Sequence, residues 1–157
     1  MQKKQRATPS QAWVKIQKYC AYQERCHREV RDKLYEMGLV SEDVDDLIVR
    51  LMEENYLNEE RFAQAFAGGK FRVKKWGRVK IVHELKARDI SAYCIKQAMK
   101  EIDDVVYYEQ LKHLLYKRWE EMKKEQNIYA RKSKTGSYLI AKGYEPVLVW
   151  DILKELS

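Results

Sequence analysis

Proline and glycine are scarce in this 157-residue chain, which contains two prolines and six glycines. Few residues therefore interrupt helices, and no segment alternates convincingly between polar and apolar side chains as a strand does. Long apolar runs are missing too, because nothing approaches the roughly 18 consecutive apolar residues that span a bilayer. The sequence thus favours an all-α protein and predicts no association with a membrane.

Cysteine is also sparse, with Cys20, Cys26 and Cys94 as the three examples. His27 follows Cys26, but no second pair of cysteine or histidine residues stands at the spacing of a zinc site, so we expect no structural metal. The odd number of cysteines and the lack of an apolar N-terminal segment indicate a reducing compartment. We therefore expect a cytoplasmic protein.

Arrangements typical of an active site are missing as well. None of the three histidines, His27, His83 and His113, has a serine, cysteine or aspartate at a recognisable nucleophile spacing. Two adjacent glycines occur at Gly68 and Gly69, but the Lys-Ser/Thr ending of a phosphate-binding loop does not follow them. We therefore expect neither catalysis nor a cofactor.

Four acidic residues stand close together: Glu42, Asp43, Asp45 and Asp46. A divalent-metal site, and with it a metal-dependent nuclease, is one interpretation of such a cluster. However, Glu42 and Asp43 fall in the first turn of a predicted helix, where the helix dipole favours acidic side chains. The other two lie opposite the apolar stripe of that helix. We interpret the cluster as an acidic face that contacts water or a partner protein.

What the chain has in excess is positive charge, and that charge is unevenly distributed. The formal net charge is +7, made up of +5 in residues 1–38, −6 in residues 39–61, +8 in residues 62–100 and a balanced remainder. Segregation of this kind steers a protein towards polyanions and also leaves it an acidic face. Binding to an acidic partner is therefore a more specific interpretation than solubility alone.

The stretch GGKFRVKKWGRVK, residues 68–80, concentrates this charge, with six cations and no acid in the eleven residues from Lys70 onward. The cations are Lys70, Arg72, Lys74, Lys75, Arg78 and Lys80. We predict that they bind a phosphate or carboxylate partner, because uncompensated like charges repel one another. Backbone N–H groups at a helix start near Gly77 would add to an anion site. Trp76 is a candidate for stacking on an exposed base, whereas Phe71 is expected in the core.

A second basic run lies in ARKSKTGSYLIAKG, residues 130–143, and its candidate binding residues are Arg131, Lys132 and Lys134. The small polar residues among these cations indicate a mobile segment between helices rather than a rigid site. If the helices are arranged along a curve, the two basic runs line one surface.

An internal repeat organises the chain. Three predicted helices carry apolar residues at i, i+3, i+4 and i+7, starting from Val44, Ile95 and Val149. The residues before the first of them recur 51 positions later and, less completely, 54 positions after that. The matching sets are Val30, Leu34, Gly38, Leu39; then Ile81, Leu85, Asp89, Ile90; then Thr135, Leu139, Gly143, Tyr144, in which Thr135 departs from the apolar pattern. Each set predicts a helix and a sharp turn before the final helix.

A further helix opens each repeat, with Ser10 and Asn58 as predicted N-caps and with a third start at about Asp103. We therefore predict an elongated all-α array of three tandem three-helix units, with about nine helices. Units of about 50 residues are too small to bury a large core alone, so neighbours should pack against each other. The predicted divisions are a disordered basic arm at residues 1–9 and units at residues 10–57, 58–102 and 103–157.

The segment REVRDKLYEMGLVSEDVDDLIVRLMEENYLNEERFAQAF, followed by WGRVKIVHELKARDIS, resembles the RecX family of bacterial recombination regulators. The likeness consists of a leucine-bearing helix, a glycine-hydrophobic turn, an apolar helix and the step YLNEERFA into a basic helix that glycine opens. It covers about residues 12–156 and is firmest over residues 29–90. Cys26, Asn58 and Asp89 depart from the residues usual in the family.

The resemblance implies tandem three-helix units and a non-enzymatic protein that binds the RecA recombinase, typically as its filament on single-stranded DNA. It also implies inhibition of strand exchange, a place in recombination, DNA repair and the SOS response, and contacts with single-stranded and double-stranded DNA. On this interpretation residues 70–80 face the filament, and the acidic residues between 42 and 60 meet basic protein surface. We expect a monomer whose several weak contacts with a filament add up.

Two other functions also fit the residues. One is a direct DNA-binding protein of helix-turn-helix-like units, although the final helices carry acids where a recognition helix favours cations and amides. The other is a helical-repeat adaptor for another acidic protein. A steep salt dependence with sequence preference would indicate the first, and indifference to both DNA and recombinase would indicate the second.

Overall fold

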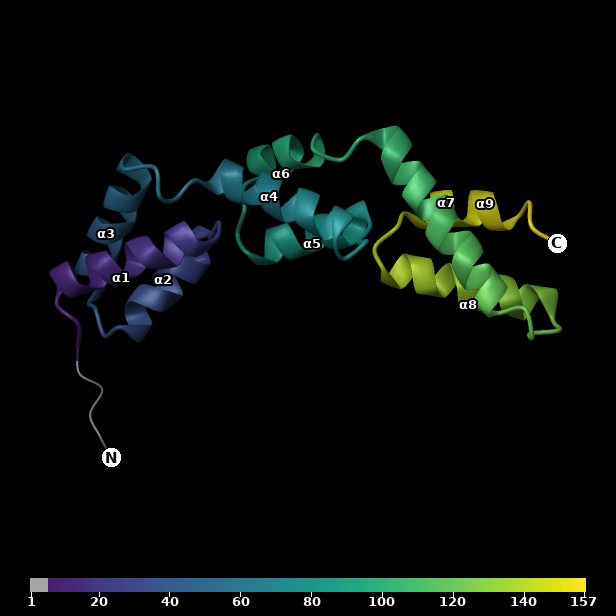
Figure 1. Ribbon diagram of the computed structural model, residues 1–157, viewed down its shortest axis with the longest axis horizontal. Coiled ribbons are helices and arrows are strands. Elements are labelled where there is room, and N and C mark those ends of the chain that lie inside the picture. The colour runs from purple at the N-terminus through teal and green to yellow at the C-terminus, as the bar shows by residue number, and fades with distance from the viewer. Residues whose placement is uncertain (1–5) are drawn as a thin grey trace, which may run out of the picture.

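The computed structural model describes residues 6–157, and this part of the chain consists of nine α-helices without a β-strand. The helices are α1 (Pro9–Tyr22), α2 (His27–Glu36), α3 (Ser41–Glu53), α4 (Glu59–Arg72), α5 (Arg78–Ala87), α6 (Ala92–Met99), α7 (Asp104–Glu121), α8 (Ile128–Ala141) and α9 (Pro146–Leu153). They form unit 1 (α1–α3), unit 2 (α4–α6) and unit 3 (α7–α9), which follow one another in an elongated row (Figure 1). The predicted all-α array of three-helix units is confirmed.

Helix α1 begins one residue before the predicted N-cap, so the assignment of Ser10 as the cap is wrong. Thr8 is the N-cap: its side chain accepts a hydrogen bond from the Gln11 N–H at 3.2 Å, and the Gln11 side chain accepts one from the Thr8 N–H at 3.0 Å. Pro9 favours this start because the first helical position needs no N–H donor. Residues 1–5 of the predicted basic arm lie outside the described residues.

The three predicted turns share one backbone geometry. Gly38, Asp89 and Gly143 each have a positive φ, of 87°, 59° and 100° respectively. The N–H of the apolar residue after each turn donates to a carbonyl five positions earlier, in the pairs Leu39–Leu34, Ile90–Leu85 and Tyr144–Leu139. This bond is typical of a helix that ends in a left-handed residue. The repeat seen in the sequence is therefore a repeat of helix-terminating structure.

Thr135 is the exception within the repeated core. It is fully buried, as are the matching residues Val30 and Ile81, but its hydroxyl has no hydrogen-bond partner. Thr135→Val is expected to raise the free energy of unfolding by about 1 kcal/mol, because valine keeps the shape and removes an unsatisfied polar atom. Urea unfolding measures the change, with Thr135→Ser as a control that loses a buried methyl group. A less stable valine variant would contradict the prediction.

The apolar side chains form two cores. One lies inside unit 1 and the other runs without a break through units 2 and 3. Cys26 of unit 1 is buried in the second core, and the ion pair between Arg61 and Glu24 adds a polar contact between units 1 and 2. Units 2 and 3 thus share one apolar interior. No helix within residues 6–157 is long and apolar enough to cross a membrane.

Candidate binding surface

The basic stretch at residues 68–80 joins α4 to α5 and lies where unit 2 meets unit 3 (Figure 1). The predicted placement, at the end of one helix with Gly77 as the N-cap of the next, is confirmed. Phe71 is 5% exposed and belongs to the core, also as predicted. The six cations, however, do not form one surface, because the fold divides them into an inward and an outward set.

Lys70 and Lys80 belong to the inward set. Their ammonium nitrogens lie 5.0 and 4.4 Å from the ring centroid of Trp76, within the range of cation–π attraction. Trp76 is half-buried and packs edge-on against Phe66, with ring centroids 6.3 Å apart. The indole is therefore part of the junction, and a base stacking on it would compete with a bound ammonium group.

Arg78 also belongs to the inward set, and two carboxylates of unit 3 compensate its charge. Its guanidinium forms ion pairs with Asp104 at 2.6 Å and Glu145 at 3.2 Å, and it stacks 3.9 Å from the ring centroid of Tyr107. The Tyr107 hydroxyl donates to Glu145 in turn. Burial and this carboxylate raise the pKa of the Tyr107 hydroxyl, which therefore stays protonated. We assign Arg78 to the junction of units 2 and 3.

Three N–H groups at the start of α5 bind oxygens of unit 3, so they are not available to an anion in the way the prediction requires. The Gly77 N–H donates to the Lys142 carbonyl at 2.8 Å and the Val79 N–H to the Gly143 carbonyl at 2.9 Å. The Arg78 N–H donates to the Tyr107 hydroxyl at 3.1 Å. The N–H groups at the start of any helix have no partner within that helix. Here three of them bind oxygen atoms of unit 3 and so attach it to unit 2.

The outward set comprises Arg72, Lys74 and Lys75, all of which are exposed. We call residues 72–75 the cationic tip. Val73 lies among the cations and is 75% exposed. Lys75 has a φ of 61°, a left-handed conformation that costs a non-glycine residue about 1 kcal/mol. The tip thus presents three cations in four residues. One of them, Lys75, has a backbone conformation that favours glycine.

The second basic run is not a mobile segment, and that prediction is wrong, because residues 128–141 form α8. Arg131 donates to the Trp119 carbonyl at 2.7 Å and stacks over the Trp119 ring, while Lys134 pairs with Glu125 at 2.7 Å. Lys132 is half-buried. Ten residues, or about 15 Å of helix, lie between Lys132 and the turn that connects α8 to α9 next to the tip.

The predicted acidic residues lie on α3 in unit 1. Glu42, Asp45 and Asp46 are exposed, Asp43 is half-buried, and Asp45 pairs with Arg31 at 2.8 Å. Glu42 and Asp43 fall in the first turn of the helix, as predicted. Across residues 6–157, no three His, Cys, Asp or Glu side chains come together as a metal site.

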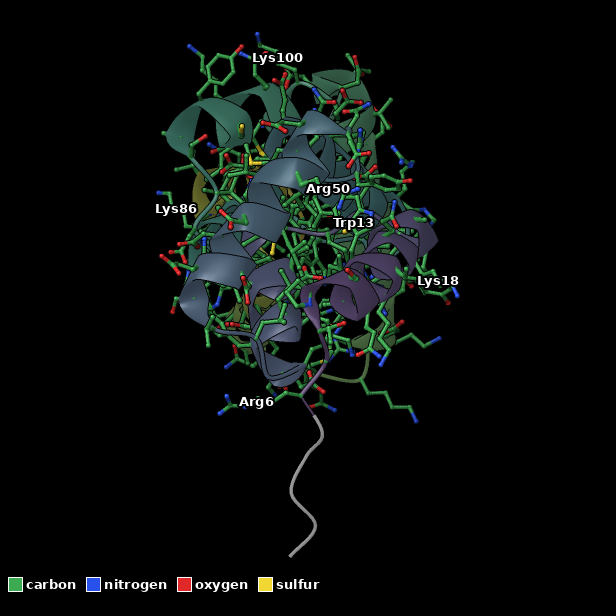
Figure 2. All side chains as sticks on the ribbon, turned by 90° about the vertical axis from the view of Figure 1, so that its left-hand side faces the viewer. Arg6, Trp13, Lys18, Arg50, Lys86 and Lys100 are labelled. Carbon is green, nitrogen blue, oxygen red and sulfur yellow. The ribbon has the colours of Figure 1, made fainter. Side chains whose placement is uncertain are left out.

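Other cations point in several directions around the row of helices. Figure 2 views the protein from the unit 1 end and shows Lys18, Lys86 and Lys100 projecting at different edges. On the near surface Arg50 stacks on Trp13, with its guanidinium carbon 3.8 Å from the ring centroid (Figure 2). Among the described residues the tip presents three exposed cations within four positions, whereas Lys18, Lys86 and Lys100 stand apart from one another.

The residues that hold the basic stretch at residues 68–80 in place could not be identified from the sequence. They are Asp104, Tyr107, Gln110, Tyr144 and Glu145, all from unit 3. They lie 26 to 69 residues from their partners, and neither helical periodicity nor local charge signals such contacts. The exposed cations were recognisable from the sequence, but their separation from the compensated ones required the fold.

Comparison with known proteins gives a consistent result. Two protein-family models match this chain. The model "RecX, second three-helix domain" matches residues 58–99, and the model "RecX, third three-helix domain" matches residues 106–153. Regulatory protein RecX of Clostridium perfringens is 30% identical over 134 residues, or 85% of this chain and 62% of that protein. Regulatory protein RecX of Prosthecochloris aestuarii is 26% identical over 88% of each chain. The crystal structure of RecX from Lactobacillus salivarius matches with a TM-score of 0.82 at 20% identity, over 94% of this chain and 96% of that one.

Proposed function

This chain belongs to the RecX family, and from that premise we propose that it inhibits a RecA recombinase by binding the recombinase filament on single-stranded DNA. The proposal places it in the cytoplasm, in recombination and DNA repair, and involves no catalytic step. The observation that carries it is the cationic tip, where Arg72, Lys74 and Lys75 are all exposed. A filament offers both DNA phosphates and acidic protein surface to such a tip.

The tip suits phosphate contacts for electrostatic reasons. None of its three cations forms an ion pair among the described residues. Binding phosphate would release counterions from the DNA, which favours association at low salt. Arg72 can in addition contact two phosphate oxygens at once, because its guanidinium presents a planar set of donors. We therefore assign the direct DNA contact of the proposed complex to the tip.

The acidic face of α3 fits a different part of the same partner. Phosphate repels Glu42, Asp45 and Asp46, so this face would contact basic protein surface. Units 1 and 2–3 occupy different parts of an elongated row (Figure 1), so the two contacts can involve neighbouring protomers of a filament. Linked weak contacts then give the filament a much higher affinity than one free protomer.

Direct DNA binding through helix-turn-helix-like units is less well supported by the fold. The third helix of each unit would be the recognition helix. Helix α3 carries the four acidic residues, and α9 has Asp151 as its charged residue between Pro146 and Leu153. Recognition helices normally present cations and amides to the major groove. The filament proposal needs no such helix.

Binding to the filament can be separated from binding to its components. We expect the dissociation constant for a RecA filament on labelled single-stranded DNA to be about 100-fold lower than that for free RecA or for the DNA alone. Fluorescence anisotropy measures binding to the filament, formed with a non-hydrolysable ATP analogue, and to the DNA alone. Calorimetry measures binding to free RecA. Equal affinity for filament and bare DNA would favour the DNA-binding alternative, and no affinity for either would reject the proposal.

A further inference from the structure

Both ends of the cationic tip are held by side chains of unit 3. The Gln110 amide nitrogen donates to the Phe71 carbonyl at 3.2 Å, just before the tip. The Tyr144 hydroxyl donates to the Lys75 carbonyl at 2.9 Å, at its far end. The same amide also donates to the Tyr144 hydroxyl at 2.8 Å. One connected set of hydrogen bonds thus links α7 and the turn before α9 to the tip.

Tyr144 is well suited to hold this conformation. The residue is fully buried, and its ring packs on that of Tyr107 with centroids 5.3 Å apart. Burial raises the pKa of its hydroxyl, so the group stays protonated and donates at neutral pH. The carbonyl that it binds belongs to Lys75, the residue of the tip with the unfavourable left-handed backbone.

We propose that Tyr144 is a positioning residue for filament binding: its hydroxyl holds the Lys75 carbonyl and thereby presents Lys74 and Lys75 in one fixed arrangement. The inference rests on the proposed function. A loop that is ordered before binding loses less conformational entropy when it meets its partner. Unit 3 therefore increases filament affinity through Tyr144 without this side chain touching the filament.

Tyr144→Phe tests the inference because it removes one hydroxyl and no charge. We expect filament affinity to fall by about 3- to 10-fold, the range of one net hydrogen bond, with an unchanged dependence on salt concentration. Amide hydrogen exchange at residues 72–76 should accelerate. The matched control is Ile152→Val, which removes a buried methylene from α9 and leaves every hydrogen bond at the tip intact. The control should bind the filament as the unaltered protein does.

A double-mutant cycle separates positioning from a general loss of structure. The second variant, the tip variant, combines Arg72→Ala, Lys74→Ala and Lys75→Gly, and it keeps the Lys75 carbonyl that Tyr144 binds. Tyr144→Phe should have no further effect on the affinity of the tip variant, because the two changes act through the same contact.

Two outcomes would overturn the inference: unchanged affinity of Tyr144→Phe, or the same loss in both backgrounds. These results are distinguishable from failure of the proposed function. If the proposed function is wrong, the unaltered protein itself will not bind the filament, or the tip variant will bind it as strongly as the unaltered protein.

Discussion

Gly77→Ala is expected to lower the free energy of unfolding by about 3 kcal/mol or more and to detach unit 3 from unit 2. A Cβ atom at Gly77 would lie 2.3 Å from the carbonyl carbon and oxygen of Gly143 and 2.4 Å from the nitrogen of Tyr144. These are backbone atoms, which cannot rotate away, so relief of the overlap requires the junction to open. The hydrogen bond from the Gly77 N–H to Lys142 would then be lost as well.

Gly69→Ala is the matched control, because it makes the same chemical change eight residues earlier. A Cβ atom there would have no neighbour within 4 Å, and the residue lies inside α4. Alanine is therefore expected to raise the free energy of unfolding by up to about 1 kcal/mol. Urea unfolding measures both variants. Equal stability of Gly77→Ala and the unaltered protein would show that units 2 and 3 are not joined through this contact.

The tip variant is expected to bind the RecA filament about 100-fold more weakly at moderate salt. Three exposed cations are removed, and a solvent-exposed charge pair contributes at most about 1 kcal/mol, so three of them correspond to about 100-fold in affinity. The slope of log K against log salt concentration should also become shallower by about 2, since three fewer counterions are released from single-stranded DNA. Lys75→Gly within this variant relieves the left-handed backbone, so the loss of affinity should come without a loss of stability.

A second variant controls for net charge. Lys86, Lys96 and Lys100 are exposed cations of unit 2 that lie outside the tip, and Lys86 and Lys100 project at separate edges in Figure 2. Changing all three to alanine removes as much charge as the tip variant does. Its filament affinity should fall only slightly, through long-range attraction. An equal loss in the two variants would show that the general positive field, rather than the tip, drives binding.

Much of the fold could be predicted because its signals are local. The caps Asn58 and Asp103 accept hydrogen bonds within their own first turns, so a residue type next to an apolar stripe is enough to locate them. The turn at Asp89 followed from its alignment with Gly38 and Gly143, and all three have positive φ. Ser10 is not the cap because Pro9 favours the first helical position, which places the cap at Thr8.

The second basic run shows where local signals fail. Its small polar residues have low helix propensity, which by itself predicts a flexible segment. In the fold Gly136 allows α9 to come close, since a Cβ atom there would lie 3.0 Å from Leu153 and 3.2 Å from Trp150. Packing between α8 and α9 therefore outweighs propensity. A small residue at a helix contact and a small residue in a loop look the same in a single sequence.

The candidate site was only half predictable for a related reason. The number of cations between residues 70 and 80 is a property of the sequence, but their availability depends on distant partners. Arg78 meets Glu145, 67 residues away, and Lys75 meets Tyr144, 69 residues away. No pattern within the basic stretch distinguishes Arg78 from Lys74. The structure places the first in the junction, paired with carboxylates, and leaves the second exposed.

The most direct test of the account is ATP hydrolysis by the cognate RecA on single-stranded DNA, titrated with this protein. We expect suppression at well below one molecule per recombinase protomer, both for the unaltered protein and for the variant lacking Lys86, Lys96 and Lys100. The tip variant should need a concentration about 100-fold higher for the same suppression. Equal suppression by the tip variant, or none by the folded unaltered protein, would contradict the account.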